Sequence, residues 1–257
     1  MVDRKRTKQS APLFRSTNRK GQFDLDRQHT YEVFDANPVT CAVGGGAASD
    51  TAQTANAMLF PETAFEYAAI GTQTLTAPVL TATGLDIGMD QTNNDGVEIT
   101  QGITAKSRRA FTIGTSPAFF VRLKFKIEDV SGSDQFGVGF RKTQAYQAAI
   151  ASYTDKAFIG SVSGDIKINT LLNNAGGVIT DTTQDWADGE THTLKVIVSA
   201  AGVVTYQIDG AAPTATAAFT FDNGDIVVPF IWMINDSDVV GTAELIEYEC
   251  GYVGNES

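Results

Sequence analysis

The stretch Phe119-Phe120-Val121-Arg122-Leu123-Lys124-Phe125-Lys126-Ile127 decides the fold class, because apolar and charged residues alternate along most of it. In a β-strand successive side chains point to opposite faces, so the apolar residues share one face and the cations share the other. One face then packs against a core while the other meets water. The pattern predicts a half-buried strand of an antiparallel sheet between residues 118 and 130.

Similar alternations, separated by Gly, Asn, Asp and Pro, continue from about residue 61 to the end of the chain. This texture is typical of many short antiparallel strands. The run 226–234 is apolar at nearly every position, so we expect a central strand with Trp232 in or near the core. Residues 143–152 could form either a short helix or a strand. Further strands are predicted at residues 135–141, 157–162, 165–170, 191–199, 203–209 and 244–253.

Two turn signals suggest how some of these strands pair. Ala200-Ala201-Gly202 makes a plausible turn between strands 191–199 and 203–209. Asp222-Asn223-Gly224-Asp225 contains an Asn-Gly pair, which indicates a type I′ hairpin between residues 219–221 and the run 226–234. The sequence therefore predicts an all-β, antiparallel sandwich over residues 61–257.

Residues 1–60 differ in texture, since they show neither helical nor strand periodicity. Residues 1–40 resemble an extended arm with isolated apolar anchors, and the Gly- and Ala-rich residues 41–59 resemble a connector. Residues 1–30 carry eight basic and three acidic residues, whereas the remainder of the chain has a net charge of −16. A basic segment on an acidic body suggests docking onto a partner, although a solvated leader is the alternative. The residues expected to make these contacts are Arg4, Lys5, Arg6, Lys8, Leu13, Phe14, Arg15, Arg19, Lys20, Phe23 and Tyr31.

Composition excludes several classes of function. The longest apolar stretches fall short of the ~20 residues that a membrane helix needs, and the start of the chain has no apolar signal segment. We therefore expect no membrane anchor and assembly in a cytoplasm, with Cys41 and Cys250 as free thiols. The acidic body would repel phosphates, which makes nucleic acid an unlikely partner.

The segment from Trp186 to Val198, followed by Ala201 to Gly210 with its Asp-Gly ending, resembles the concanavalin A-like lectin and glucanase family, including laminin-G-type modules. The resemblance extends more loosely over residues 80–254. It implies a two-sheet antiparallel jelly-roll sandwich, here with an extended N-terminal arm. The arm and the Ala- and Thr-rich texture also resemble structural proteins of tailed bacteriophages, such as head decoration proteins or fibres.

These resemblances imply a non-enzymatic virion protein, a capsid decoration or cement protein that its arm anchors to the major capsid protein or another virion protein. The expected location is the virion, assembled in the host cytoplasm, and a homo-oligomer such as a trimer or dimer suits such a part. The alternative is a carbohydrate-binding, lectin-like module of a fibre or host-recognition protein, with a surface glycan as its ligand. Exposed aromatic residues would support that alternative, and the candidates are Tyr146, Tyr153, Trp186 and Tyr206.

Catalytic patterns are weak. Glucanases of the resembled family place carboxylates as Glu-x-Asp-x-Glu on one strand face, whereas Glu244, Glu247 and Glu249 surround Tyr248. We expect Glu247 and Glu249 to share a face, Glu244 to lie opposite, and the strand to be a solvated acidic edge. His192 is expected to be an outward strand residue, and no histidine pair suits zinc.

Polar loops at residues 90–96 and 235–238 carry oxygen ligands, but they miss the EF-hand pattern and fit ordinary turns. We therefore expect no catalytic residue, no cofactor and no metal.

Overall fold

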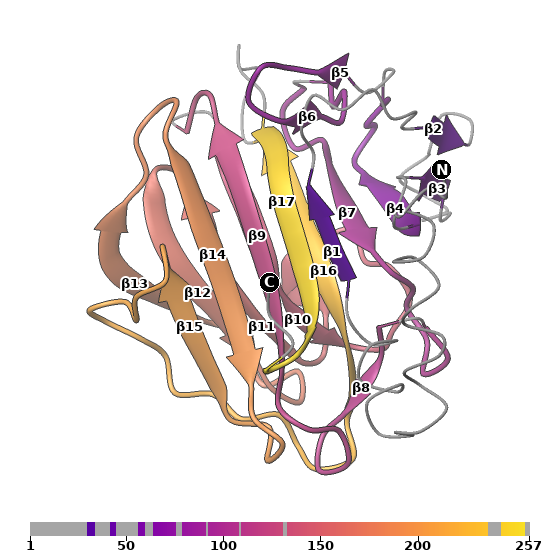
Figure 1. Ribbon diagram of the computed structural model, residues 1–257, viewed down its shortest axis with the longest axis vertical. Coiled ribbons are helices and arrows are strands. Elements are labelled where there is room, and N and C mark those ends of the chain that lie inside the picture. The colour runs from indigo at the N-terminus through magenta and orange to yellow at the C-terminus, as the bar shows by residue number, and fades with distance from the viewer. Residues whose placement is uncertain are drawn as a thin grey trace, which may run out of the picture.

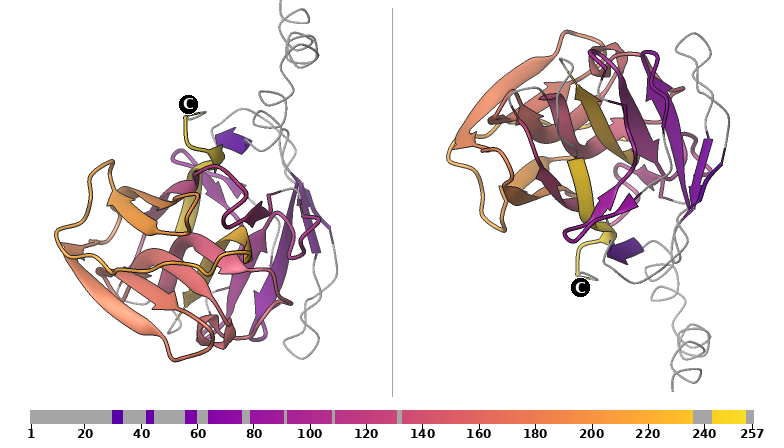
Figure 2. Two further views of the ribbon diagram at one scale, coloured as in Figure 1. Left: turned by 90° about the horizontal axis from the view of Figure 1, so that it is seen from below. Right: turned by 90° about the horizontal axis from the view of Figure 1, so that it is seen from above.

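The computed structural model describes residues 30–33, 42–44, 56–59, 64–75, 79–90, 92–107, 109–130, 133–235 and 243–254. These residues form two antiparallel sheets that pack face to face, which confirms the predicted all-β sandwich (Figures 1 and 2). Within them, no helix is both long and apolar enough to cross a membrane.

The first sheet, sheet A, is centred on the strand that the opening stretch predicted. Its strands, in spatial order, are β15 (Val204–Ile208), β14 (Thr191–Val198), β9 (Phe119–Ile127), β17 (Ala243–Tyr252), β6 (Leu85–Asp86) and β5 (Val79–Leu80). A further strand, β1 (Thr30–Val33), pairs with β17.

The second sheet, sheet B, is larger and has the apolar run as an interior strand. Its strands, in spatial order, are β13 (Val178–Asp185), β12 (Asp165–Leu171), β11 (Lys156–Val162), β10 (Ser133–Lys142), β16 (Ile226–Asn235), β7 (Gly96–Thr100), β4 (Ala64–Ile70), β3 (Asn56–Leu59) and β2 (Ala42–Gly44). The two-residue strand β8 (Phe111–Thr112) also pairs with β16.

The main core lies between the sheets. The apolar face of β9 is buried as predicted, and Phe119 stacks on Phe111 with ring centroids 4.2 Å apart and meets Phe140 edge-on at 5.0 Å. Trp232 of β16 is also buried, but it belongs to a second apolar cluster, separate from this core. Burial on both faces of β16 follows from these two clusters.

The predicted hairpin at residues 219–226 is wrong. Residues 222–225 do form a turn, in which the Asp225 N–H donates to the Asp222 carbonyl at 3.1 Å. A type I′ turn needs positive φ at both central residues, and only Gly224 has it (φ 90°). Thr220 bridges to Val203 instead, while Ile226 pairs with Thr112.

The segment 143–152, which the sequence left open between helix and strand, is a loop with one 3₁₀ turn at Ile150–Ser152. The strand β13 was not predicted, because most of its residues are exposed and it lacks an apolar period. In the segment expected to be arm and connector, β1 joins sheet A, and β2 and β3 join sheet B. The domain boundary near residue 60 stays a prediction.

Replacing Phe119 with Ala should lower the free energy of unfolding by about 3–5 kcal/mol, because it leaves a cavity between Phe111 and Phe140. The matched control is Val178→Ala at a site 58% exposed, which should change stability by less than about 0.5 kcal/mol. Urea unfolding of both variants checks this. Equal stabilities would contradict the packing described here.

Candidate functional site

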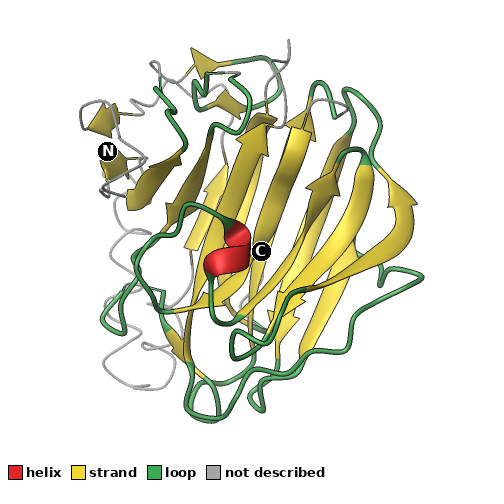
Figure 3. Ribbon diagram, turned by 180° about the vertical axis from the view of Figure 1, so that it is seen from behind, coloured by secondary structure: helices red, strands yellow, loops and turns green. Residues whose placement is uncertain are grey.

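A loop of residues 143–155 crosses the outer face of sheet B (Figure 3). From this loop, Ile150 and Tyr153 join the second apolar cluster, in which Phe158, Phe230 and Trp232 are each about 1% exposed. The aromatic side chains on this face are therefore covered, and they offer no open stacking surface.

Two glycines of sheet B make room for the aromatic ring of Phe158. A Cβ atom added at Gly137 would come within 2.7 Å of Phe158 Cζ, and one added at Gly160 within 2.8 Å. Because both positions lack side chains, the ring can lie against the strands. This close packing helps to seal the face beneath the loop.

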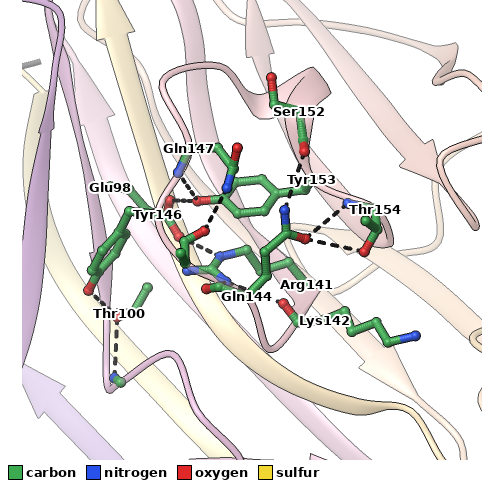
Figure 4. Close-up of polar contacts among 12 residues, drawn as sticks. Glu98, Thr100, Arg141, Lys142, Gln144, Tyr146, Gln147, Ser152, Tyr153 and Thr154 are labelled. Carbon is green, nitrogen blue, oxygen red and sulfur yellow. Dashed lines mark hydrogen bonds and ion pairs between the residues drawn. The ribbon is translucent and has the colours of Figure 1, made fainter. Parts of the chain in front are cut away.

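A buried ion pair fastens the loop to the sheet (Figure 4). Arg141 Nε of β10 lies 2.6 Å from Glu98 Oε1 of β7, and both side chains are almost completely buried. Arg141 Nη1 donates to the carbonyls of Lys142 at 3.2 Å and Gln144 at 3.0 Å. The guanidinium carbon also lies 4.4 Å from the ring centroid of Tyr153. Arg141 therefore joins strand, loop backbone and loop side chain.

Two tyrosines of the loop complete this network. The Tyr153 hydroxyl donates to Glu98 Oε2 and accepts from the Gln147 N–H at 3.2 Å. The hydroxyls of Tyr146 and Thr100 lie 2.9 Å apart. Burial raises the pKa of both tyrosines, so both remain neutral hydroxyls.

The same burial acts on the charged groups. It raises the pKa of Glu98, against the opposing effects of Arg141 and the Tyr153 hydroxyl. It also lowers the pKa of Lys156 to about 8, and the ammonium of Lys156 donates to the Ile150 carbonyl at 2.8 Å. Perturbed pKa values often mark functional sites, but these groups are shut off from solvent by the loop. Their arrangement anchors the loop and does not form an open acid–base site.

An open polar surface lies beside this network, where the loop 143–155 meets residues 172–175 and 222–225. We call these three segments the loop end. Asn173 N donates to Asp155 Oδ1 at 2.7 Å, and Asn173 Nδ2 donates to Asp222 Oδ2 at 2.8 Å. Asn174 N donates to the Thr154 carbonyl at 2.9 Å. The three segments are thus tied together, although they are far apart in sequence.

The base of the loop end is ionic. Lys142 Nζ lies 2.5 Å from Asp225 Oδ1 and 3.6 Å from Asp155 Oδ2. Its hydrogen bond with Asp225 raises the pKa of Lys142. Above this base, Asn173, Asn174, Asp222 and Asn223 are exposed. The surface therefore presents amide and carboxylate groups on a fixed support.

The residues predicted to contact a partner lie almost entirely outside the described residues. Only Tyr31 falls within them, as part of β1, where it pairs with Glu249 of β17. The partner-binding role of the arm is therefore a prediction that the described structure leaves open.

The predictions for the acidic strand are wrong in two respects. β17 is an interior strand between β9 and the strands β1 and β6, so it is not a solvated edge. A register shift between Leu245 and Glu247 also turns Glu244 to the same face as Glu247 and Glu249.

Cations of β9 pair with all three of these carboxylates. Arg122 lies 2.8 Å from Glu249 and 3.6 Å from Glu247, and Lys126 lies 3.8 Å from Glu244. These pairs neutralise the carboxylates, which leaves no free acid and nucleophile of the glycosidase kind.

The two polar loops considered for calcium are joined to each other. Asn235 Nδ2 donates to the Asp90 carbonyl at 3.2 Å, while the Asp90 and Asp95 carboxylates accept the N–H groups of Thr74 and Thr72 at 2.6 and 2.7 Å. In the described part of the chain, no group of three or more His, Cys, Asp or Glu residues is arranged to hold a metal ion. Residues 236–238 lie outside it.

The aromatic candidates for glycan stacking are all buried, with Tyr146, Tyr153, Trp186 and Tyr206 at most 5% exposed. His192 does not point outward as predicted, since it lies opposite Phe125 and against the Trp186 ring.

Of the two cysteines, Cys250 is a buried free thiol whose pKa burial raises to about 12. Cys41 lies outside the described residues.

Solved structures of similar shape include two domains named for lumenal or carbohydrate-recognition roles. The potassium-bound Emp46p carbohydrate recognition domain has a TM-score of 0.48 at 8% identity, over 74% of this chain and 89% of that chain. The metal-free exoplasmic/lumenal domain of VIP36 has a TM-score of 0.48 at 11% identity, over 75% and 86%. A protein of unknown function from Shewanella oneidensis MR-1 scores 0.47 at 12% identity, over 75% and 81%. No protein-family model and no curated protein matches the sequence.

Replacing Glu98 with Gln should lower the free energy of unfolding by about 3–5 kcal/mol, because it leaves the buried guanidinium of Arg141 without its carboxylate. Glu247→Gln is the matched control. It removes an exposed partner of Arg122 and Lys124 and should cost at most about 1 kcal/mol. Chemical unfolding of both variants measures the difference, and similar costs would show that the Glu98 pair does not anchor the loop.

The lowered pKa of Lys156 predicts a dependence of stability on pH. Between pH 8 and about 10.5 the unfolded chain holds a proton that the folded chain has lost, so stability should rise with pH across this window. Lys156→Met should abolish this contribution while keeping the apolar stem. Melting temperatures of both proteins from pH 7.5 to 10.5 provide the test, and parallel curves would refute the assignment.

Proposed function

We propose that this chain is a non-catalytic, lectin-like binding module with a concanavalin A-like jelly-roll fold, and that its ligand is a glycan. The observation that carries the proposal is the loop end, where exposed Asn173, Asn174, Asp222 and Asn223 stand on a hydrogen-bonded support. Binding residues on loops that a rigid sandwich positions are a common arrangement.

The chemistry of these groups suits sugar hydroxyls. A hydroxyl both donates and accepts, an amide offers both roles in one plane, and a carboxylate accepts two hydrogen bonds. The Asn173–Asp222 contact fixes one amide against one carboxylate at 2.8 Å. Because the support holds these groups in place, little side-chain freedom would be lost on binding.

The closed outer face of sheet B supports the same location. Its aromatic side chains are buried beneath the loop 143–155, so ligand contacts would fall on the loop end beside it. Without an exposed aromatic ring among the described residues of the loop end, recognition would rest on hydrogen bonds.

Glycan-array binding by the full-length chain tests this proposal. Asn173→Ala and Asp222→Ala should each weaken binding about tenfold or more, because each removes polar contacts and loosens the loop end. Asp188→Ala is the matched control, since it changes an exposed carboxylate at the opposite end of the sandwich. Absence of any binding, or equal loss in all three variants, would contradict the proposal.

A second candidate is the structural role in a bacteriophage particle, as a capsid decoration protein whose arm binds the major capsid protein or another virion protein. The pairing of β1 with β17 favours it, because it would fix the base of a basic N-terminal segment to the sandwich. Ordering such a segment over a neighbouring subunit would provide many weak contacts. A homo-oligomer and a virion location belong to the same proposal.

Co-sedimentation with undecorated phage heads tests the second candidate. The full-length chain should sediment with the heads, while a variant with Arg4, Lys5, Arg6 and Lys8 replaced by Ser should bind more weakly and lose its salt dependence. Binding that is unchanged in this variant, or no binding by either protein, would count against attachment through the arm.

A further inference from the structure

His192 lies between two carboxylates at the end of the sandwich opposite the loop end. Its Nδ1 is 2.6 Å from Asp209 Oδ2, and its Nε2 is 3.3 Å from Glu190 Oε2. Glu190 belongs to the loop that precedes β14, whereas Asp209 belongs to the turn that follows β15. The imidazole ring therefore connects two separate segments of the chain.

Both carboxylates are held in place independently of the histidine. Asp209 Oδ1 accepts the Thr193 N–H at 2.8 Å, and Glu190 Oε2 accepts the Ala187 N–H at 3.0 Å. Asp209 also adopts a left-handed backbone conformation with φ 51°. Their positions beside the ring are consequently features of the fold and not of one flexible rotamer.

The ring also contacts the end of the core. The His192 and Trp186 rings meet edge-on with centroids 4.6 Å apart, and Trp186 in turn lies 4.6 Å from Phe125 of the core. Trp186 is 2% exposed, and its Nε1 donates to the Glu190 carbonyl at 3.1 Å. Loop 186–190 thus covers this end of the core.

The protonation state of the ring decides how many of its contacts are hydrogen bonds. A neutral imidazole has one N–H group, so it can donate to only one of the two carboxylates, whereas an imidazolium donates to both. Glu190 and Asp209 are the charged groups in contact with the ring among the described residues. Two neighbouring charges are engaged elsewhere, since Asp188 accepts the Val130 N–H at 3.0 Å and Lys126 lies 3.8 Å from Glu244.

We propose that His192 is a pH-operated clasp that ties loop 186–190 to the turn at Asp209 when it is protonated. Loss of the proton removes one of the two hydrogen bonds and leaves a ring lone pair facing a carboxylate. The folded state therefore favours the protonated ring. The stability that the clasp contributes is fully present at acidic pH and is lost as pH rises through the titration of the histidine.

The test is the melting temperature of the full-length chain and of His192→Gln at pH 5 and pH 8. We expect the wild-type protein to exceed the variant by about 2–4 °C more at pH 5 than at pH 8, the shift expected for one such contact in a domain of this size. Comparison with the variant removes the effect of the other carboxylates that titrate in this range.

Two further substitutions make the experiment decisive. Asp209→Asn keeps an acceptor for Thr193 and tolerates positive φ, but it removes one charge beside the ring, so it should reduce the pH-dependent difference even if His192→Gln folds poorly. His29→Gln removes the other histidine of the chain and should leave the difference unchanged. The same pH dependence in wild type, His192→Gln and Asp209→Asn would overturn the proposal.

Discussion

The buried pair between Glu98 and Arg141 is the interaction on which the arrangement of this molecule depends. It joins β7 to β10 across the outer face of β16, and the same guanidinium holds the backbone of the loop 143–155. A buried charge pair adds little net stability, but its geometry is demanding, because each charge must keep its partner. The pair therefore specifies where the loop lies more than it strengthens the fold.

The position of that loop determines what the rest of the molecule can present. With Tyr153 inserted beside Glu98, the aromatic side chains of sheet B are covered, and the polar groups that remain accessible near this face belong to the loop end. On sheet A the outward cations of β9 are matched by the carboxylates of β17, so that face is balanced in charge along these strands. The loop end and the end around His192 are thus the two places where unbalanced polar groups gather in the described structure.

Much of the sandwich follows from periodicity of two. β9, β11, β12 and β14 lie where alternation predicted them, because one face of each strand packs against the core. The strand pairing at residue 226 could not be predicted, since turn chemistry is local whereas the partner of Ile226 is the two-residue strand β8. The orientation of Glu244 depends on a one-residue bulge, which reverses the face that simple counting gives.

The candidate site was less accessible to sequence reasoning than the fold. Asn173 and Asp222 are 49 residues apart and meet only because two turns converge at one end of the sandwich. The adjacent pair Asn173-Asn174, with both residues at positive φ, is a turn signal that could have marked one half of this contact. The loop 143–155 has no period of its own, because individual tyrosines and one lysine anchor it and no continuous apolar face does.

Hydroxyl-radical footprinting of the full-length chain tests the closed face of sheet B most directly, since Tyr153, Phe158, Phe230 and Trp232 are readily oxidised only when solvent reaches them. The account predicts strong protection of these four side chains in the native protein and its loss in Glu98→Gln, where the loop would lose its anchor. Oxidation of the native protein at rates typical of exposed aromatic residues would show that the face is open, and it would move the proposed ligand contacts from the loop end onto the sheet itself.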